Sequence, residues 1–135
     1  MRKIAASFAM AGLVGLMLLP AGALAQATNY LVFFAPWSAA IDSNGKAAIA
    51  IAAKNALSHP NDPVIVVGSA DTVGGAAANT DMAGTRAQVV ADALVADGVP
   101  RGRIAIVSTG GLKAPGAAAG SYAQFSRRVL IQVGS

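Results

Sequence analysis

The most informative part of the sequence is the stretch NTDMAGTRAQVVADAL, which occupies residues 79–94. Its small and apolar residues recur every three to four positions, which is the spacing of one face of an α-helix. The pattern predicts a helix over Thr80–Asp97 with Asn79 as its N-cap, and Gly98 followed by Pro100 is typical of a helix end. The side chains expected on the inner face are Met82, Ala83, Ala87, Val90 and Leu94.

Short apolar runs bounded by Gly, Pro and Asn predict four strands around this helix. The first run is rich enough in large apolar residues to predict a strand buried on both faces. An Ala-rich segment between the first two runs predicts another helix, with one stripe formed by Ile49, Ala53 and Leu57. The predicted strands are 30–34, 64–67, 104–107 and 129–133, and the first helix is 47–57.

The order of these elements predicts an α+β fold. Strand, helix, strand, helix, strand, strand corresponds to a two-layer βαβαββ sandwich, in which a mixed four-stranded sheet packs against two helices. Helices on one face of the sheet are the simplest arrangement for so few elements. No repeat and no long linker divides the segment into a second domain.

The N-terminus predicts a secretory signal peptide. Arg2 and Lys3 form a basic start, residues 4–19 are apolar and uncharged, and Pro20 ends the run. The small-x-small pattern at residues 23–25 predicts cleavage after that segment, so that 1–25 is the signal peptide. An uncleaved anchor helix is the alternative, but the apolar run is shorter than the ~20 residues of a membrane span. Cleavage would leave a chain without a transmembrane span.

The composition excludes several classes of protein. Residues 26–135 form a predicted single domain with eight basic and six acidic residues, a net charge of +2, and no cysteine. The chain therefore has no disulfide, no thiol chemistry and no cysteine for lipid attachment. No basic stripe interleaves with aromatic residues, so nucleic acid is not an expected partner.

Enzymatic readings find little support in the residues. His59 is the single histidine, and it lies between a helix end and a proline, as an exposed loop residue would. Metal binding needs several converging ligands, which the chain does not offer. Ser69 and Ser108 lie near strand ends with no base marked as their partner. The glycines of 68–75 lack the Lys-Ser/Thr of a phosphate-binding loop. We expect no catalysis, metal or cofactor.

One constellation points to binding. Asp71 follows the second predicted strand, and Asn79 and Arg86 are seven residues apart on one helix stripe. Because a long helical side chain leans toward the N-terminus, Arg86 can converge on Asp71. A carboxylate beside a guanidinium forms a receptor for a zwitterion, with one group for an ammonium and the other for a carboxylate. An ordinary Asp71–Arg86 salt bridge that orients the loop is the alternative.

The same residues carry a resemblance to a known family. The pattern NxxMAxxRAxxVxxxL at 79–94 resembles the Asn-x-x-Leu-Ser-x-x-Arg-Ala-x-x-Val-x-x-x-Leu signature of OmpA-like C-terminal domains, which are shared with MotB and Pal. GSADTVG at 68–74 resembles their Gly-His-Thr-Asp-x-x-Gly loop, and SRRV at 126–129 resembles their Asn-Arg-Arg-Val-Glu element. VFF at 32–34 with SAAI at 38–41 resembles the opening Phe-Asp-Phe-Asp-Ser-Ala-x-Leu.

The resemblance implies non-covalent binding of peptidoglycan through the diaminopimelate of the stem peptide. By position, Asp71 would hold the ammonium and Arg86 the carboxylate. Asn79 would form a hydrogen bond nearby, and Arg127 would line the pocket from the last strand. A periplasmic protein associated with the cell wall or outer membrane of a Gram-negative bacterium is implied, with outer-membrane or periplasmic proteins as further partners. Apart from the resemblance, we expect weaker contributions at the pocket rim from Ala35, Trp37 and Val73, and a plain rim or core role is the alternative for Trp37.

The sequence departs from the family pattern at several polar positions. Ala35 and Ala70 replace an acidic residue and a threonine, Gly111 stands where a glutamate is usual after the third strand, and Leu130 replaces the closing glutamate. Each replacement removes a polar contact. These departures keep a second hypothesis open, a degenerate scaffold of the same fold that binds a periplasmic partner protein.

Overall fold

The computed structural model describes residues 27–111 and 124–134. The predicted signal peptide, residues 1–25, lies outside the described residues, as does most of the small-residue loop expected after the third strand. Among the helices of the described part, none has both the length and the apolar character needed to cross a bilayer.

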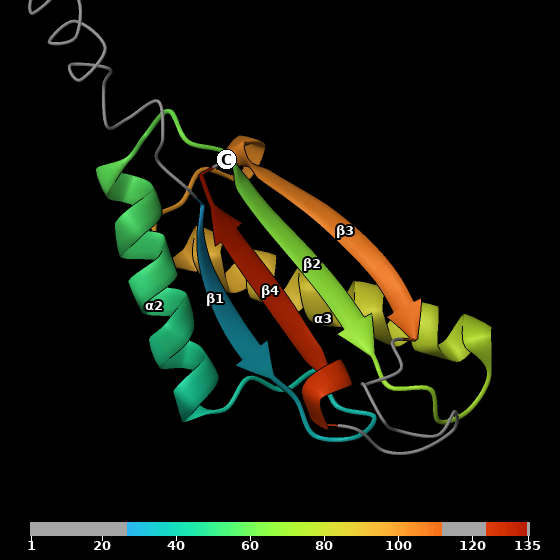
Figure 1. The fold of residues 1–135 in the computed structure, drawn as a ribbon. Helices are drawn as coiled ribbons and strands as arrows, with labels where there is room; N and C mark the ends of the chain where they lie inside the picture. Colours follow the sequence, from blue (N-terminus) through green and yellow to red (C-terminus); the bar gives the residue numbers. More distant parts are fainter. Residues whose placement is uncertain (1–26, 112–123, 135) are drawn as a thin grey trace, which may run out of the picture.

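The described residues form one mixed sheet with two helices on one of its faces (Figure 1). The strand order is β1-β4-β2-β3; β4 runs antiparallel to β1 and β2, while β2 and β3 are parallel. This arrangement confirms the predicted βαβαββ sandwich. The elements are β1 (Thr28–Phe33), α2 (Ser43–Ser58), β2 (Val64–Ala70), α3 (Ala76–Ala96), the 3-10 turn η2 (Arg101–Arg103), β3 (Ile104–Gly111), the 3-10 turn η3 (Gln124–Ser126) and β4 (Arg128–Val133).

The core lies between the helices and the covered face of the sheet. Alternate residues of β2 and β4, such as Val66 and Ile131, point into it and are fully buried. The expectation that the first strand is buried on both faces is wrong, because Leu31 is 41% exposed while Val32 is buried. The physical reason is that helices cover only one face, so alternate residues of β1 face solvent.

The first helix is longer than the sequence pattern predicted. It begins at Ser43 because Asp42 caps it: its Oδ1 accepts a hydrogen bond of 2.7 Å from the Gly45 N–H. Ile49 and Ala53 are buried as expected, but Leu57 is 47% exposed and lies outside the core.

The second helix, α3, also begins earlier than predicted. Its N-cap is Gly75 and its first residue is Ala76, so the prediction that Asn79 caps the helix is wrong. Asn79 lies inside the first turn, where its N–H donates to the Gly75 carbonyl at 3.1 Å. Four of the five predicted inner residues are fully buried and Met82 is half-buried. At the other end Gly98, with a φ of 107°, closes the helix as the sequence indicated.

One glycine fixes how closely α3 approaches the sheet. A Cβ built on Gly68 in β2 would lie 2.1 Å from the carbonyl oxygen of Ala83 in α3. Only a residue without a side chain fits there, because backbone oxygen cannot move aside. This contact holds the end of β2, which Asp71 directly follows, against the part of α3 that precedes Arg86.

Candidate functional site

Four segments meet at the end of the sheet that lies at the bottom of Figure 1. They are the loop after β1, the loop after β2, the start of α3 and the segment formed by η3 and the start of β4. The Phe34 N–H donates to the Arg127 carbonyl at 2.9 Å, which joins the first of these segments to the last. The Ser69 hydroxyl donates to the carbonyls of Ser126 and Arg128 at 2.8 and 3.1 Å, which ties β2 to the same place. Residues distant in sequence are thereby held together.

Asp71 is buried in the middle of this cluster. It follows β2 directly and is 5% exposed. Its Oδ1 accepts from the Val73 N–H at 3.2 Å, a turn that aspartate forms readily. Its Oδ2 lies 3.2 Å from Nη1 of Arg127. The carboxylate is therefore fixed by the loop on one side and by a guanidinium on the other.

Arg127 is the ion-pair partner of Asp71. Sequence reasoning expected it only to line the pocket, because 56 residues separate the two and spacing alone gives no sign of the contact. Its Nε donates to the Phe34 carbonyl at 2.9 Å, which orients the guanidinium. The side chain is 10% exposed, so the pair lies at the border between the interior and solvent.

Within the described residues, Arg86 donates to three carbonyls and forms no ion pair with a carboxylate. Its Nε donates to Ser38 at 2.8 Å, its Nη1 to Ser69 at 3.3 Å and its Nη2 to Ala35 at 3.0 Å. The guanidinium also lies 5.3 Å from the ring centre of Phe34, and the residue is 1% exposed. The alternative prediction, an Asp71–Arg86 salt bridge, is therefore wrong, because the ion-pair partner of Asp71 is Arg127. Arg86 clamps the loop after β1 onto the end of β2.

The three ionisable groups influence one another electrostatically. Burial lowers the pKa of the Arg86 guanidinium from its ordinary value; neighbouring Arg127 lowers it further, while Asp71 raises it. Arginine stays protonated at neutral pH even so. Two guanidinium groups therefore face one carboxylate, which leaves one positive charge in the cluster unmatched. Such a cluster favours a ligand that brings a negative group.

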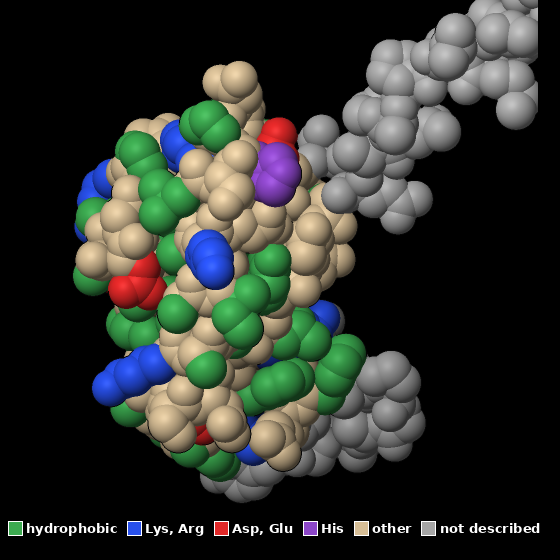
Figure 2. Space-filling view, turned by 90° about the vertical axis from the view of Figure 1, so that its left-hand side faces the viewer, with side chains coloured by type: hydrophobic (Ala, Val, Ile, Leu, Met, Phe, Trp, Pro, Cys, Tyr) green, Lys and Arg blue, Asp and Glu red, His purple; other side chains and the backbone are tan. Residues whose placement is uncertain are grey.

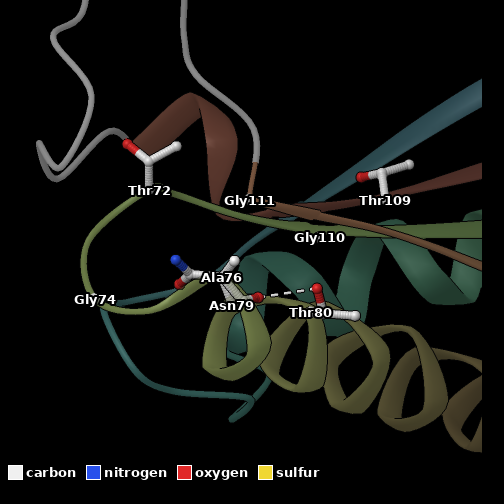
Figure 3. A pocket seen from close by; sticks show the side chains of 8 residues that line it. All are labelled: Thr72, Gly74, Ala76, Asn79, Thr80, Thr109, Gly110 and Gly111. Atoms are coloured by element: carbon white, nitrogen blue, oxygen red, sulfur yellow. Dashed lines mark hydrogen bonds between the residues drawn. The ribbon is translucent and has the colours of Figure 1, made fainter.

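Two cavities lie at this end of the sheet, and one member of the ion pair, Arg127, lines the second of them. The first has a volume of about 260 Å³ and lies between the loop after β2, the start of α3 and the end of β3 (Figure 3). The second has a volume of about 350 Å³ and contains Arg127 in its wall. The first cavity is lined by Thr72, Gly74, Ala76, Asn79, Thr80 and the segment 109–111, and the second by the segment 33–36, Asp42, Gln124 and Arg127.

Asn79 is a buried amide that faces the first cavity. The residue is 3% exposed, and within the described residues its side chain has no hydrogen-bond partner. Figure 3 shows the amide directed toward the loop that carries Thr72 and Gly74. The amide atoms themselves are not fully enclosed, because the cavity reaches them, so this group is available to a bound molecule.

The three predicted rim residues lie around these cavities. Ala35 is exposed and lines the second cavity. Trp37 is 45% exposed and its ring packs against Gly74 of the first cavity. Val73 is half-buried and supplies the N–H that Asp71 accepts. His59, one of the residues considered for catalysis, lies exposed in the loop after α2, as the sequence predicted.

No metal centre is found within the described ranges, where no three His, Asp or Glu side chains come together in a way that could hold an ion.

Comparison with known proteins identifies relatives of this fold. Residues 33–128 match the model of the OmpA family. The solved peptidoglycan-associated lipoprotein of Burkholderia pseudomallei is 29% identical, with a TM-score of 0.68 over 76% of this chain and 89% of that one. Two structures of lower identity share the fold. The OmpA-like domain of FopA1 from Francisella tularensis is 23% identical, with a TM-score of 0.63 over 79% of this chain and 71% of that one. The periplasmic domain of Helicobacter pylori MotB is 22% identical, with a TM-score of 0.63 over 82% and 75%.

No curated protein sequence matches the chain significantly. The family match nevertheless covers well over half of the residues and includes every charged side chain of the cluster. Domains of this kind are non-catalytic, typically bind peptidoglycan and occur in the periplasmic parts of cell-envelope proteins. The chain therefore belongs to the OmpA family.

Proposed function

We propose that this domain binds peptidoglycan non-covalently through the diaminopimelate side chain of the stem peptide. The observation that carries the proposal is the buried cluster of Asp71, Arg127 and Arg86, which carries one unmatched positive charge and reaches the second cavity through Arg127. The end of a diaminopimelate side chain is a zwitterion, with an ammonium and a carboxylate on one carbon. It offers an acceptor for the guanidinium and a donor for the carboxylate.

The contacts support a division of roles among the site residues. Asp71 accepts hydrogen bonds from the ammonium. The guanidinium of Arg127, which donates to Asp71 in the free domain, donates instead to the ligand carboxylate. One internal ion pair is thereby exchanged for two pairs with the ligand, which limits the cost of separating the buried charges. Asn79 offers its free amide from the adjoining cavity. Arg86 acts differently from the sequence-based assignment: its three carbonyl bonds hold the loops, and its charge acts at a distance.

The decisive experiment is co-sedimentation with purified sacculi that contain diaminopimelate. Asp71→Asn keeps the shape of the side chain and removes its charge. A charge-assisted hydrogen bond contributes about 1.5–3 kcal/mol, so we expect affinity to fall by roughly 10- to 150-fold. Asp92→Asn is the matched control, because it changes the net charge equally at an exposed position. Equal pelleting of Asp71→Asn and native protein contradicts the assignment.

The chemistry of the ligand offers a second test. Sacculi in which the free diaminopimelate carboxyl is amidated lack the negative group that the cluster favours. We expect weaker binding to them than to unmodified sacculi of the same organism, measured at equal mass of wall. Indistinguishable binding would show that the positive charge of the cluster plays no part in recognition.

A degenerate scaffold that binds a periplasmic partner protein is the second candidate. Ala35 and Ala70 favour it, since both stand where the family pattern has a polar residue, and Ala70 is buried with no polar group to offer. Failure of the native domain to sediment with sacculi at low salt, combined with capture of one defined envelope protein, is the result expected of this candidate.

We further propose that residues 1–25 direct export and are removed, which leaves the domain in the periplasm beside the wall and the outer membrane. Cell fractionation followed by N-terminal sequencing of the periplasmic form tests this directly. A mature N-terminus at Gln26 is the expected result, and an intact Met1 in the membrane fraction contradicts it.

A further inference from the structure

Trp37 is unusual both in its exposure to solvent and in its backbone conformation. It is the single tryptophan of the chain, and 45% of its surface is exposed. Its φ of 52° makes it the one non-glycine residue in the described ranges with a left-handed backbone. A bulky residue adopts this conformation only where its surroundings enforce it, and such positions concentrate at binding sites.

Hydrogen bonds fix the loop that carries Trp37. Arg86 donates to the carbonyls of both Ala35 and Ser38, which stand on either side of Trp37. The Ser38 N–H also donates to the Ala35 carbonyl at 3.2 Å and closes the turn. The indole is therefore presented to solvent on a preorganised support, which lowers the entropic cost of using it in binding.

The indole stands between the two cavities of the site. A Cβ built on Gly74 would lie 2.9 Å from Cη2 of Trp37, so the ring rests on that glycine. Gly74 lines the first cavity, whereas Ala35 and Pro36, directly before Trp37, line the second. Hydrophobic side chains gather at the lower right of Figure 2, toward the end of the molecule where β1 ends.

We propose that Trp37 is a stacking platform for a sugar ring of the glycan strand to which the bound stem peptide is attached. This inference rests on the proposed function and adds the glycan as a second part of the ligand. Two residues and the diaminopimelate side chain itself separate the sugar from the site, so a bound peptide keeps that sugar within roughly 15–20 Å of it. The aliphatic C–H face of a pyranose packs well on a flat apolar ring.

The polar edge of the indole suits the same ligand. Among the described residues the indole N–H of Trp37 has no hydrogen-bond partner. An aromatic ring with a free donor at its edge matches a sugar that carries an N-acetyl carbonyl beside an apolar face. The resemblance to the family does not supply this residue, since Trp37 follows one of the positions where the sequence departs from the pattern.

The test compares two soluble ligands by calorimetry: the free diaminopimelate tripeptide and the same tripeptide on its N-acetylglucosamine–N-acetylmuramic acid disaccharide. Native protein should bind the disaccharide form about ten-fold more tightly, as one well-formed stacking contact allows. Trp37→Ala should bind both forms with the affinity of the free peptide, and Trp37→Phe should keep most of the difference. Ile51→Ala, which removes an exposed apolar side chain of α2, should behave as native protein.

Intrinsic fluorescence gives an independent readout, because all tryptophan emission comes from Trp37. The disaccharide form should shift the emission to shorter wavelength and the free peptide should not. Equal native affinity for both ligands overturns the inference, and so does an equal loss of both ligands in Trp37→Ala with an unchanged melting temperature. Binding of neither ligand by native protein overturns the proposed function, and the inference with it.

Discussion

The two ends of the sheet use arginine in the same way and yet differ in chemistry. At the end opposite the site, Arg103 donates to the carbonyls of Ala56, His59 and Asp62 at distances of 2.6–3.2 Å. Its hydrogen bonds in the described part of the chain all end on backbone oxygens. At the site end Arg86 does the same for the loops there, but Arg127 beside it reaches a carboxylate. An arginine that holds loops is thus common to both ends, whereas the buried charge pair distinguishes the site.

The largest expected effect is that of Arg86→Ala. Three carbonyls would lose the donor that Arg86 supplies, two in the loop after β1 and one in β2, although the Ala35 carbonyl keeps the Ser38 N–H. A buried carbonyl left unpaired costs about 1–3 kcal/mol. We expect the free energy of unfolding to fall by about 3–5 kcal/mol, measured by urea denaturation followed by circular dichroism. A loss below about 1 kcal/mol would mean that the clamp is not structural. Binding data on this variant are therefore interpretable only for its folded fraction.

Arg127→Ala should have a smaller effect on stability and a larger one on binding. It leaves Asp71 buried without its partner, which we expect to cost about 2–3 kcal/mol of unfolding free energy. Sedimentation with sacculi should be lost in protein that is still folded at 10 °C. Arg127→Lys, which keeps the charge but loses the fork, should recover stability more than binding. Native-like sedimentation of Arg127→Ala contradicts the role proposed for the pair.

Arg103→Ala tests the end of the sheet opposite the site. The side chain is only half-buried, so water can replace part of what it donates. We expect a loss of about 1–2 kcal/mol in unfolding free energy with unchanged sedimentation. Reduced binding in the folded variant would show that the two ends are coupled and that the distinction between them fails.

Ser126→Ala should have the smallest effect. Within the described residues its Oγ is the one buried side-chain polar atom without a hydrogen-bond partner. The hydroxyl is removed from water in the folded state without a hydrogen bond to compensate for it, and replacing it with hydrogen loses little packing. We therefore expect the free energy of unfolding to rise by no more than about 0.5 kcal/mol. Thermal denaturation measures it. A clear loss of stability would indicate that the hydroxyl has a partner in solution.

The elements of the fold could be predicted from sequence because each leaves a local signal. The four strands, both helices and their order follow from apolar periodicity and from residues such as Gly98. The starts of the helices could not be predicted as well. Asn79 has the chemistry of a cap, yet Gly75 takes that place, and Asn79 lies one turn further along the helix, where it lines the first cavity. Burial on one face of β1 likewise depends on where the helices pack.

The members of the site could be predicted, but not the contacts among them. Asp71 and Arg86 are linked by helix geometry, which spacing reveals, and they do lie in one cluster. The ion-pair partner of Asp71 is Arg127, which is 56 residues away in the sequence and is brought close because β4 pairs with β2. Sequence spacing carries no information on such a contact. Nor does it show that the acceptors of Arg86 are backbone oxygens, because every residue has one.

The place of β4 in the sheet has a consequence for how the molecule is made. This strand comes last in the chain but lies between β1 and β2, so Thr28 in β1 pairs with Val133. During synthesis β1 therefore has no strand to pair with until β4 has been made. Contacts between residues so far apart in sequence form slowly. Arg127 immediately precedes that strand. The Asp71–Arg127 pair therefore cannot form until Arg127 has been synthesised, and removal of the segment from Arg127 through β4 removes both this pair and the strand that joins β1 to β2.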